Sequence, residues 1–67
     1  MAEGVVKWFN AIRGYGFIAP DDGSPDVFAH VSSIEGEGDR ELVEGQKVTY
    51  DTEQGPEGPQ AKQVRAL

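Results

Sequence analysis

The sequence predicts an all-β fold of five short antiparallel strands, arranged as one domain over residues 1–67. Three observations predict it. Apolar and polar residues alternate in short runs, and no apolar set recurs with the 3.6-residue period of a helix. Gly, Pro and Asp gather between these runs, as they do in turns. A chain of 67 residues has material for a single core.

Five runs are expected to form strands: residues 4–10, 15–20, 26–31, 47–53 and 60–66. The turn-rich segments "PDDGSPD" and "EQGPEGPQ" read as the loops of two hairpins. The longer segment "IEGEGDRELVEG" is acidic, with Leu42 and Val43 as its one apolar pair, and we expect an exposed, mobile loop there. Five strands with one long link after the third are typical of a Greek-key barrel of the oligonucleotide- and oligosaccharide-binding (OB) type.

Side chains alternate across a β-strand, so each expected strand offers one face to the core. In the second strand that face carries Gly14, Gly16 and Ile18, which are small or apolar. The same alternation selects Val27, Ala29 and Val31 in the third strand. The expected core centres on Ile18, Val27 and Ala29 and also includes Val6, Ile34, Val48, Tyr50, Ala61 and Val64.

The opposite face of the second and third strands carries Tyr15, Phe17, Phe28 and His30. Small domains rarely expose this much aromatic surface unless a partner covers it. Proteins that bind single-stranded nucleic acid use flat rings as platforms for bases and a few cations for phosphates. The pattern therefore predicts a single-strand binding face.

The first strand places Lys7, Trp8 and Phe9 near this face. Strict alternation would point Trp8 away from both of its neighbours. A bulge or strong twist near Asn10 would relax the alternation, and we include all three residues in the expected binding site.

Composition argues against catalysis and against metal or cofactor binding. The chain has no cysteine and a single histidine, His30, so the usual zinc ligand sets are missing. Asp26 and His30 lie four strand residues apart, too far for a catalytic hydrogen bond. The "GYGFIA" run matches a dinucleotide-binding pattern, but Pro20 and "DDG" follow where a helix would have to open. We expect no enzyme activity and no cofactor.

The net charge of −6, from 6 Lys and Arg against 12 Asp and Glu, is unfavourable for binding a polyanion. Most carboxylates fall in residues 35–44 and 51–57, however, whereas Lys7 and Arg13 lie beside the aromatic residues. With two or three phosphate contacts, the slope of log K against log salt should be about −1.4 to −2. The N-terminal segment has no signal-peptide pattern and no stretch is long enough to span a membrane, so we expect a cytoplasmic protein. The sequence carries no clear dimer signal, and a monomer is the default expectation.

The segments "KWFN", "RGYGFI" and "DVFAHVSSI", with "GPQA" near the end, make the chain similar to the bacterial cold-shock proteins. The resemblance covers the whole chain and implies a cold-shock domain of OB fold that binds single-stranded RNA and DNA with low sequence preference. It also implies an RNA chaperone that keeps transcripts unpaired and affects transcription or translation, in a cold-adaptation role. The implied contact residues are Lys7, Trp8, Asn10, Arg13, Tyr15, Phe17, Asp26, Phe28, His30 and Gln60.

Within this resemblance, Trp8, Phe17, Phe28 and His30 would stack on bases, and Lys7 and Arg13 would meet phosphates. The remaining polar residues, Asn10, Asp26 and Gln60, would bond base edges.

The chain departs from the family pattern at three places. Val31 stands where an aromatic residue is usual, Asp39 replaces the aromatic residue of the long loop, and Glu57 occupies a position that is often basic. Two missing platforms, at about 1–3 kcal/mol each, predict binding at least tenfold weaker than that of a typical member. Arg40 would offset part of this loss by lying flat on a base.

Two other functions stay open on sequence grounds. The acidic loops and the three departures fit a protein-interaction module of the same fold with weakened nucleic-acid binding. An oligosaccharide-binding OB domain would also use aromatic platforms, but it would not need cations beside them.

Overall fold

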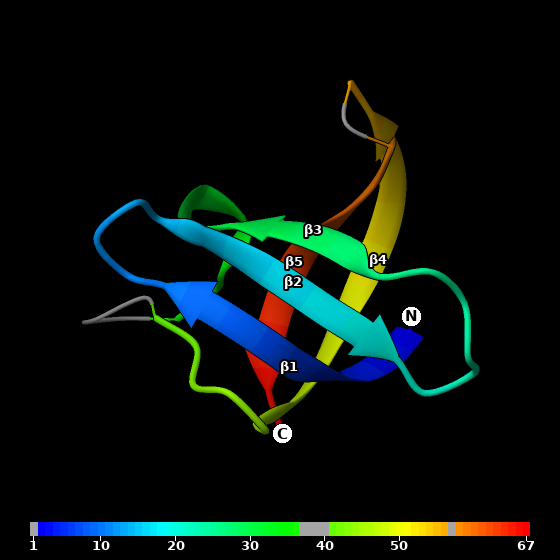
Figure 1. Cartoon of the computed structure of the whole chain (residues 1–67), viewed down its shortest axis with the longest axis horizontal. Coiled ribbons are helices and arrows are strands. Elements are labelled where there is room, and N and C mark those ends of the chain that lie inside the picture. The colour runs from blue at the N-terminus through cyan, green and yellow to red at the C-terminus, as the bar shows by residue number, and fades with distance from the viewer. Residues whose placement is uncertain (1, 37–40, 57) are drawn as a thin grey trace.

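The structure, a computed structural model, describes residues 2–36, 41–56 and 58–67 (Figure 1). Its five strands are β1 (Ala2–Asn10), β2 (Tyr15–Pro20), β3 (Val27–His30), β4 (Lys47–Gly55) and β5 (Gly58–Ala66), and a short 3-10 helix, η1 (Val31–Ser33), follows β3. The predicted all-β fold is confirmed.

The strands close into a barrel in the order β1-β2-β3-β5-β4. In Figure 1, β1, β2 and β3 form the layer nearest the viewer, and β4 and β5 cross behind them. Among these strands, four junctions are antiparallel, and the junction between β3 and β5 is parallel, with Phe28 opposite Gln60. Closure pairs the strand edges, which would otherwise be open to aggregation.

The third strand is the one that is shorter than the sequence pattern predicts. The sequence pattern extends that strand over residues 26–31, but β3 spans only Val27–His30. The backbone N–H of Val31 donates to the carbonyl of Gly14 at 2.8 Å, and the chain then turns into η1. The second strand has the limits expected from the sequence, while β1, β4 and β5 are longer.

Nine of the expected core residues are buried, and Ile18, Ala29, Val48 and Val64 are fully inaccessible. Val31, which alternation also placed on the core face, is half-buried. Leu42 joins this core at 7% exposure, so the expectation that its segment is exposed was wrong at this residue. Its neighbour Val43 is 65% exposed.

A local hydrogen-bond pair explains how adjacent loop residues take opposite sides. The N–H of Val43 donates to Gln46 Oε1 at 3.0 Å, and the N–H of Gln46 donates back to the carbonyl of Val43 at 2.9 Å. This turn fixes the backbone next to Leu42, so that the leucine side chain packs inward as Val43 points outward.

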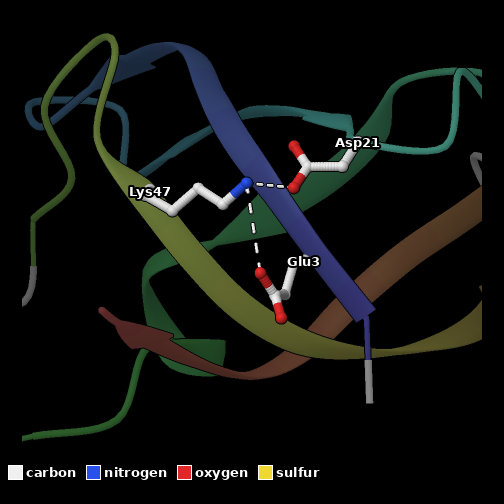
Figure 2. Close-up of polar contacts among 3 residues, drawn as sticks. All are labelled: Glu3, Asp21 and Lys47. Atoms are coloured by element: carbon white, nitrogen blue, oxygen red, sulfur yellow. Dashed lines mark hydrogen bonds and ion pairs between the residues drawn. The ribbon is translucent and has the colours of Figure 1, made fainter.

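One lysine joins three parts of the barrel on its surface. Figure 2 shows Lys47, at the start of β4, extending its ammonium group to the carboxylates of Asp21 and Glu3. The ammonium donates to Asp21 and lies 4.0 Å from Glu3 Oε1. The first strand, the end of the second and the fourth are thereby connected by charge.

Replacing Lys47 by Met should lower the free energy of unfolding by about 0.5–1 kcal/mol. The value is small because all three side chains are substantially solvated, which screens the attraction. Urea unfolding followed by Trp8 fluorescence checks it at low salt. The difference between the variant and the parent should shrink in about 1 M NaCl, where the Debye length is about 3 Å. Equal midpoints at low salt would show that the ion pairs contribute nothing.

Candidate nucleic-acid interface

Four aromatic rings form a continuous cluster on the outer face of β1, β2 and β3. Trp8 lies opposite Phe17 in the β1–β2 pairing, and Phe17 lies opposite Phe28 in the β2–β3 pairing. The centroids of Trp8 and Phe17 are 5.5 Å apart, and those of Phe17 and Phe28 are 5.7 Å apart. Tyr15 completes the cluster, with its ring centroid 5.7 Å from that of Trp8 and 5.6 Å from that of Phe28. We call Trp8, Tyr15, Phe17 and Phe28 the aromatic face.

Packing among the rings holds the aromatic face in place before any ligand arrives. Tyr15 and Phe28 are stacked with 28° between their planes, whereas Phe17 meets Phe28 edge to face at 74°. Such pairs are worth about 0.5–1.5 kcal/mol beyond the area they bury. Trp8 is 38% exposed and the other three rings are half-buried, so the rings stay accessible while their edges support one another.

A β-bulge at Lys7 resolves the conflict of facing in the first strand. The pairing of β1 with β2 shifts register between Val6 and Trp8, and Lys7 and Trp8 are both exposed. The sequence predicted a bulge near Asn10. The bulge exists, but it lies at Lys7. Phe9 is half-buried and packs against the core, so it stands apart from the aromatic face, and its contact with nucleic acid stays a prediction.

Asn10 shapes the turn that leads from β1 into β2. Its Oδ1 accepts hydrogen bonds from the backbone N–H groups of Ile12 and Arg13, both at 3.0 Å. The N–H of Gly14 donates to the carbonyl of Asn10 at 2.7 Å. The side-chain oxygen is therefore used by the turn, and the amide NH₂ is the part of Asn10 that is suited to a base.

Gly14 and Val31 meet on the inner side of this turn. Gly14 has a φ of +80°, and a Cβ there would lie 3.2 Å from Val31 Cγ1. Val31 is half-buried against the core. Val31, where the resemblance stated above leads us to expect an aromatic ring, thus packs inward.

His30 ends β3 with one ring nitrogen already bonded. Its Nδ1 accepts from the N–H of Ser32 at 3.1 Å and lies 2.9 Å from Ser32 Oγ. A backbone N–H can only donate, so Nδ1 carries no proton in this arrangement, and the neutral ring is protonated at Nε2. The exposed ring thereby offers a donor beside Tyr15, its cross-strand neighbour. Ser32 was not among the site residues expected from the sequence.

The two cations near the aromatic face differ in their partners. Lys7 Nζ forms an ion pair with Asp26 Oδ2 at 2.8 Å, and both side chains are exposed, at 57% and 38%. Arg13 is exposed in the turn after β1. Sequence reasoning assigned Lys7 to phosphate and Asp26 to a base, and the structure joins the two to each other.

Gln60 lies across the parallel junction from Phe28, on β5. Its side chain covers Gly55, because a Cβ on Gly55 would come within 1.9 Å of Gln60 Oε1. Gln60 is therefore next to Phe28 in the sheet, while its amide is directed over Gly55. Arg40, Asp39 and Glu57 lie outside the described residues.

The described residues contain neither a metal-ligand cluster nor a membrane-spanning helix. In residues 2–36, 41–56 and 58–67, no three His, Asp or Glu side chains gather where they would hold a metal ion. No helix in the part of the chain that the structure describes has the length and hydrophobicity needed to cross a bilayer.

Comparison with known proteins gives consistent matches along the chain. The model of the family described as "'Cold-shock' DNA-binding domain" matches residues 2–67. Cold shock protein ScoF of Streptomyces coelicolor is 61% identical over 64 residues, covering 96% of each chain. The major cold shock protein of Micrococcus luteus is 57% identical over 67 residues, covering 100% of both chains.

The solved structure of Drosophila Unr CSD456 resembles this chain in fold, with a TM-score of 0.79 at 18% sequence identity. The match covers 98% of this chain and 26% of the Unr chain. At this identity the likeness concerns the fold alone.

Proposed function

Because the chain belongs to the cold-shock domain family, whose members bind single-stranded nucleic acids and are not enzymes, we propose that it binds single-stranded RNA and single-stranded DNA with low sequence specificity. In the cell it acts as a monomeric, cytoplasmic RNA chaperone that keeps transcripts unpaired and thereby affects transcription or translation during cold adaptation. The single observation that carries the proposal is the aromatic face, four exposed or half-exposed rings in mutual contact on three adjacent strands.

The aromatic face supports stacking as the main source of affinity. Each base stacked on an aromatic side chain contributes about 1–3 kcal/mol, and every base has such a face, so binding by stacking discriminates little between sequences. Sequence preference then depends on the few polar groups at the margin: the donor on His30 Nε2, the Asn10 amide and Gln60.

The charges support a minor role for phosphate contacts. Lys7 is already paired with Asp26 at 2.8 Å, so it reaches a phosphate only by leaving or sharing that carboxylate. Arg13 is the exposed cation of the turn. Each phosphate contact contributes about −0.7 to the slope of log K against log salt. Two contacts give about −1.4, which is the shallow end of the range expected from the sequence.

Titration with a pyrimidine-rich DNA or RNA strand of about six to eight nucleotides tests the proposal. Trp8 is the only tryptophan of the chain and lies on the aromatic face, so its fluorescence should be quenched saturably at low salt. Repeating the titration across salt concentrations should give a slope near −1.4, and a slope steeper than about −4 would contradict binding dominated by stacking. Absence of quenching up to high micromolar strand would overturn the proposal and favour a protein-interaction module.

Chaperone activity needs a separate measurement. A hairpin RNA labelled with a fluorophore and a quencher should open on addition of the protein, because single-strand binding draws the equilibrium toward the unpaired form. If the strand binds but the hairpin stays closed, the binding function stands and the chaperone role falls.

Asp26→Asn should tighten binding of the same strand about two- to fivefold at low salt. The substitution removes the charge that holds Lys7, so the lysine no longer has to leave a carboxylate to reach a phosphate. The salt slope should stay near −1.4, because the number of phosphate contacts is unchanged. Fluorescence titration at several salt concentrations measures both effects. Glu44→Gln, which removes an exposed carboxylate from the loop before β4, is the control for net charge alone. Weaker binding by the Asp26 variant would mean that the carboxylate itself bonds a base.

A further inference from the structure

The side chain of His30 lies at the end of the aromatic face. It alternates with Phe28 on β3, so both side chains point to the outer side of the sheet. Tyr15 is its cross-strand neighbour on β2, and the N–H of Val31 donates to the carbonyl of Gly14 at 2.8 Å. The backbone that carries His30 is therefore held against the strand that supplies two rings of the aromatic face.

Ser32 holds the imidazole ring itself. Its backbone N–H donates to His30 Nδ1 at 3.1 Å, and its Oγ lies 2.9 Å from the same nitrogen. The first N–H groups of a helix have no partner within the helix, and in η1 the N–H of Ser32 is directed to the ring. His30 is exposed, and an exposed side chain without such a bond moves among several rotamers. The bond to Ser32 therefore selects one orientation of the ring.

This orientation leaves one polar atom of the ring for a ligand. Ser32 occupies Nδ1, and Nε2 carries the proton of the neutral ring. His30 therefore offers a single N–H donor beside Tyr15 and no acceptor. A base that stacks on a neighbouring ring presents its edge at the margin of the stack, and base edges carry acceptors, either carbonyl oxygens or unprotonated ring nitrogens.

We propose that His30 binds nucleic acid as a hydrogen-bond donor, from Nε2–H to an acceptor on a base edge, and that Ser32 is the positioning residue that directs this donor. The inference rests on the proposed function, because it needs a strand on the aromatic face. It differs from the stacking role that the family resemblance implies for His30. A ring that only stacks needs no fixed partner at Nδ1, whereas a hydrogen bond weakens steeply when its angle is poor.

Chemical synthesis of the full chain with His30→τ-methylhistidine tests the donor. The methyl group is on Nε2, so the variant keeps a flat, neutral ring whose Nδ1 still accepts from Ser32. Its affinity for a short thymine strand should fall about three- to tenfold, the effect of one ordinary hydrogen bond. A strand of difluorotoluene nucleotides, which have the shape of thymine without its carbonyl oxygens, should bind the parent and the variant equally. The anisotropy of labelled strands measures both affinities at about pH 8, where histidine side chains are ordinarily neutral.

Changes at Ser32 test the positioning role. Ser32→Pro removes the backbone donor, and proline suits the φ of a 3-10 helix. It should weaken binding of the thymine strand about two- to fivefold, whereas the matched control Ser32→Ala, which keeps the N–H, should change affinity less than about twofold. In the chain that carries τ-methylhistidine, Ser32→Pro should cost nothing further, because no donor is left to direct. A purely structural role of Ser32 would give the same loss in both chains.

The bond itself is measurable in the parent without any variant. An N–H···N hydrogen bond gives a scalar coupling between the two nitrogens, here the amide nitrogen of Ser32 and His30 Nδ1. This coupling should be present, and its absence would overturn the positioning role even if Ser32→Pro does not fold.

Two results would overturn the donor role. Equal affinity of the parent and the τ-methylhistidine chain for thymine would show that Nε2–H bonds no acceptor. An equal loss with the difluorotoluene strand would show that the methyl group only obstructs stacking. In both cases the parent still binds the strand, so the proposed function stands. A parent that binds neither strand would overturn the proposed function and this inference together.

Discussion

Replacing Gly16 by Ala should unfold most of the protein at 37 °C. Gly16 pairs with Phe9 across the β1–β2 junction, and the two backbones approach closely there. A Cβ on Gly16 would lie 2.2 Å from the carbonyl oxygen of Trp8 and 2.7 Å from Phe9 Cα. Both atoms belong to the backbone of β1, so a rotamer change cannot relieve the contact.

The expected cost is at least about 3 kcal/mol, the upper part of the range for overpacked sites. A domain of this size has a total stability of roughly 3–5 kcal/mol, so the loss is comparable to the whole. Urea unfolding monitored by circular dichroism and Trp8 fluorescence measures it.

Gly23→Ala is the matched control for this experiment. Gly23 has a φ of +83° and no atom within 4 Å of the position a Cβ would take. Its replacement adds only backbone strain, about 1–2 kcal/mol, and the variant should stay folded at 25 °C. If Gly16→Ala were no more destabilising than Gly23→Ala, the close approach of β1 and β2 would be wrong.

Removing Phe17 and Phe28 together should reduce affinity for a single strand at least about thirtyfold, because two lost platforms remove about 2 kcal/mol or more. Each ring supplies a stacking platform worth about 1–3 kcal/mol. The two rings are also in contact, with centroids 5.7 Å apart, so the double replacement by Ala need not equal the sum of the single ones. The anisotropy of a labelled strand is the suitable readout, because Phe17 also contacts Trp8 and its loss would alter the intrinsic fluorescence.

Val43→Ala provides the control for loss of exposed apolar surface. Val43 is 65% exposed and lies outside the aromatic face, so its binding should match that of the parent. Circular dichroism should show that the double variant keeps its β-structure, because both rings lie on the outer side of the sheet. Affinity within threefold of the parent would show that bases do not stack on these rings.

The local sequence pattern was sufficient to predict much of the fold and the residues of the aromatic face. The limits of β2 were predicted correctly because turn-forming residues mark both of its ends, Gly14 before the strand and the Pro20–Asp21 pair at its end. Alternation identified the buried side of β2 and β3, where Ile18 and Ala29 are fully inaccessible. These features depend on residues close together in sequence.

Features that depend on pairing between distant segments were not predictable in the same way. The bulge at Lys7 arises from the register of β1 against β2, and the residue type at that position does not predict it. The ion pair of Lys7 with Asp26 joins residues that are far apart in the chain. Leu42 sits in an acidic segment whose composition indicates exposure, and its burial follows from the turn closed by Gln46. Tyr50 was correctly placed in the core, but only the three-dimensional structure shows that its hydroxyl finds no hydrogen-bond partner among the described residues.

The parallel junction between β3 and β5 determines when the binding surface becomes complete during folding. Contacts within the β1–β2, β2–β3 and β4–β5 hairpins join nearby segments, whereas Phe28 and Gln60 meet only after a long stretch of chain has closed on itself. The four rings can therefore assemble before Gln60 arrives beside them. A nucleic-acid strand that contacts both Phe28 and Gln60 stabilises a pairing that forms late in folding. Binding should therefore slow unfolding far more than it accelerates folding.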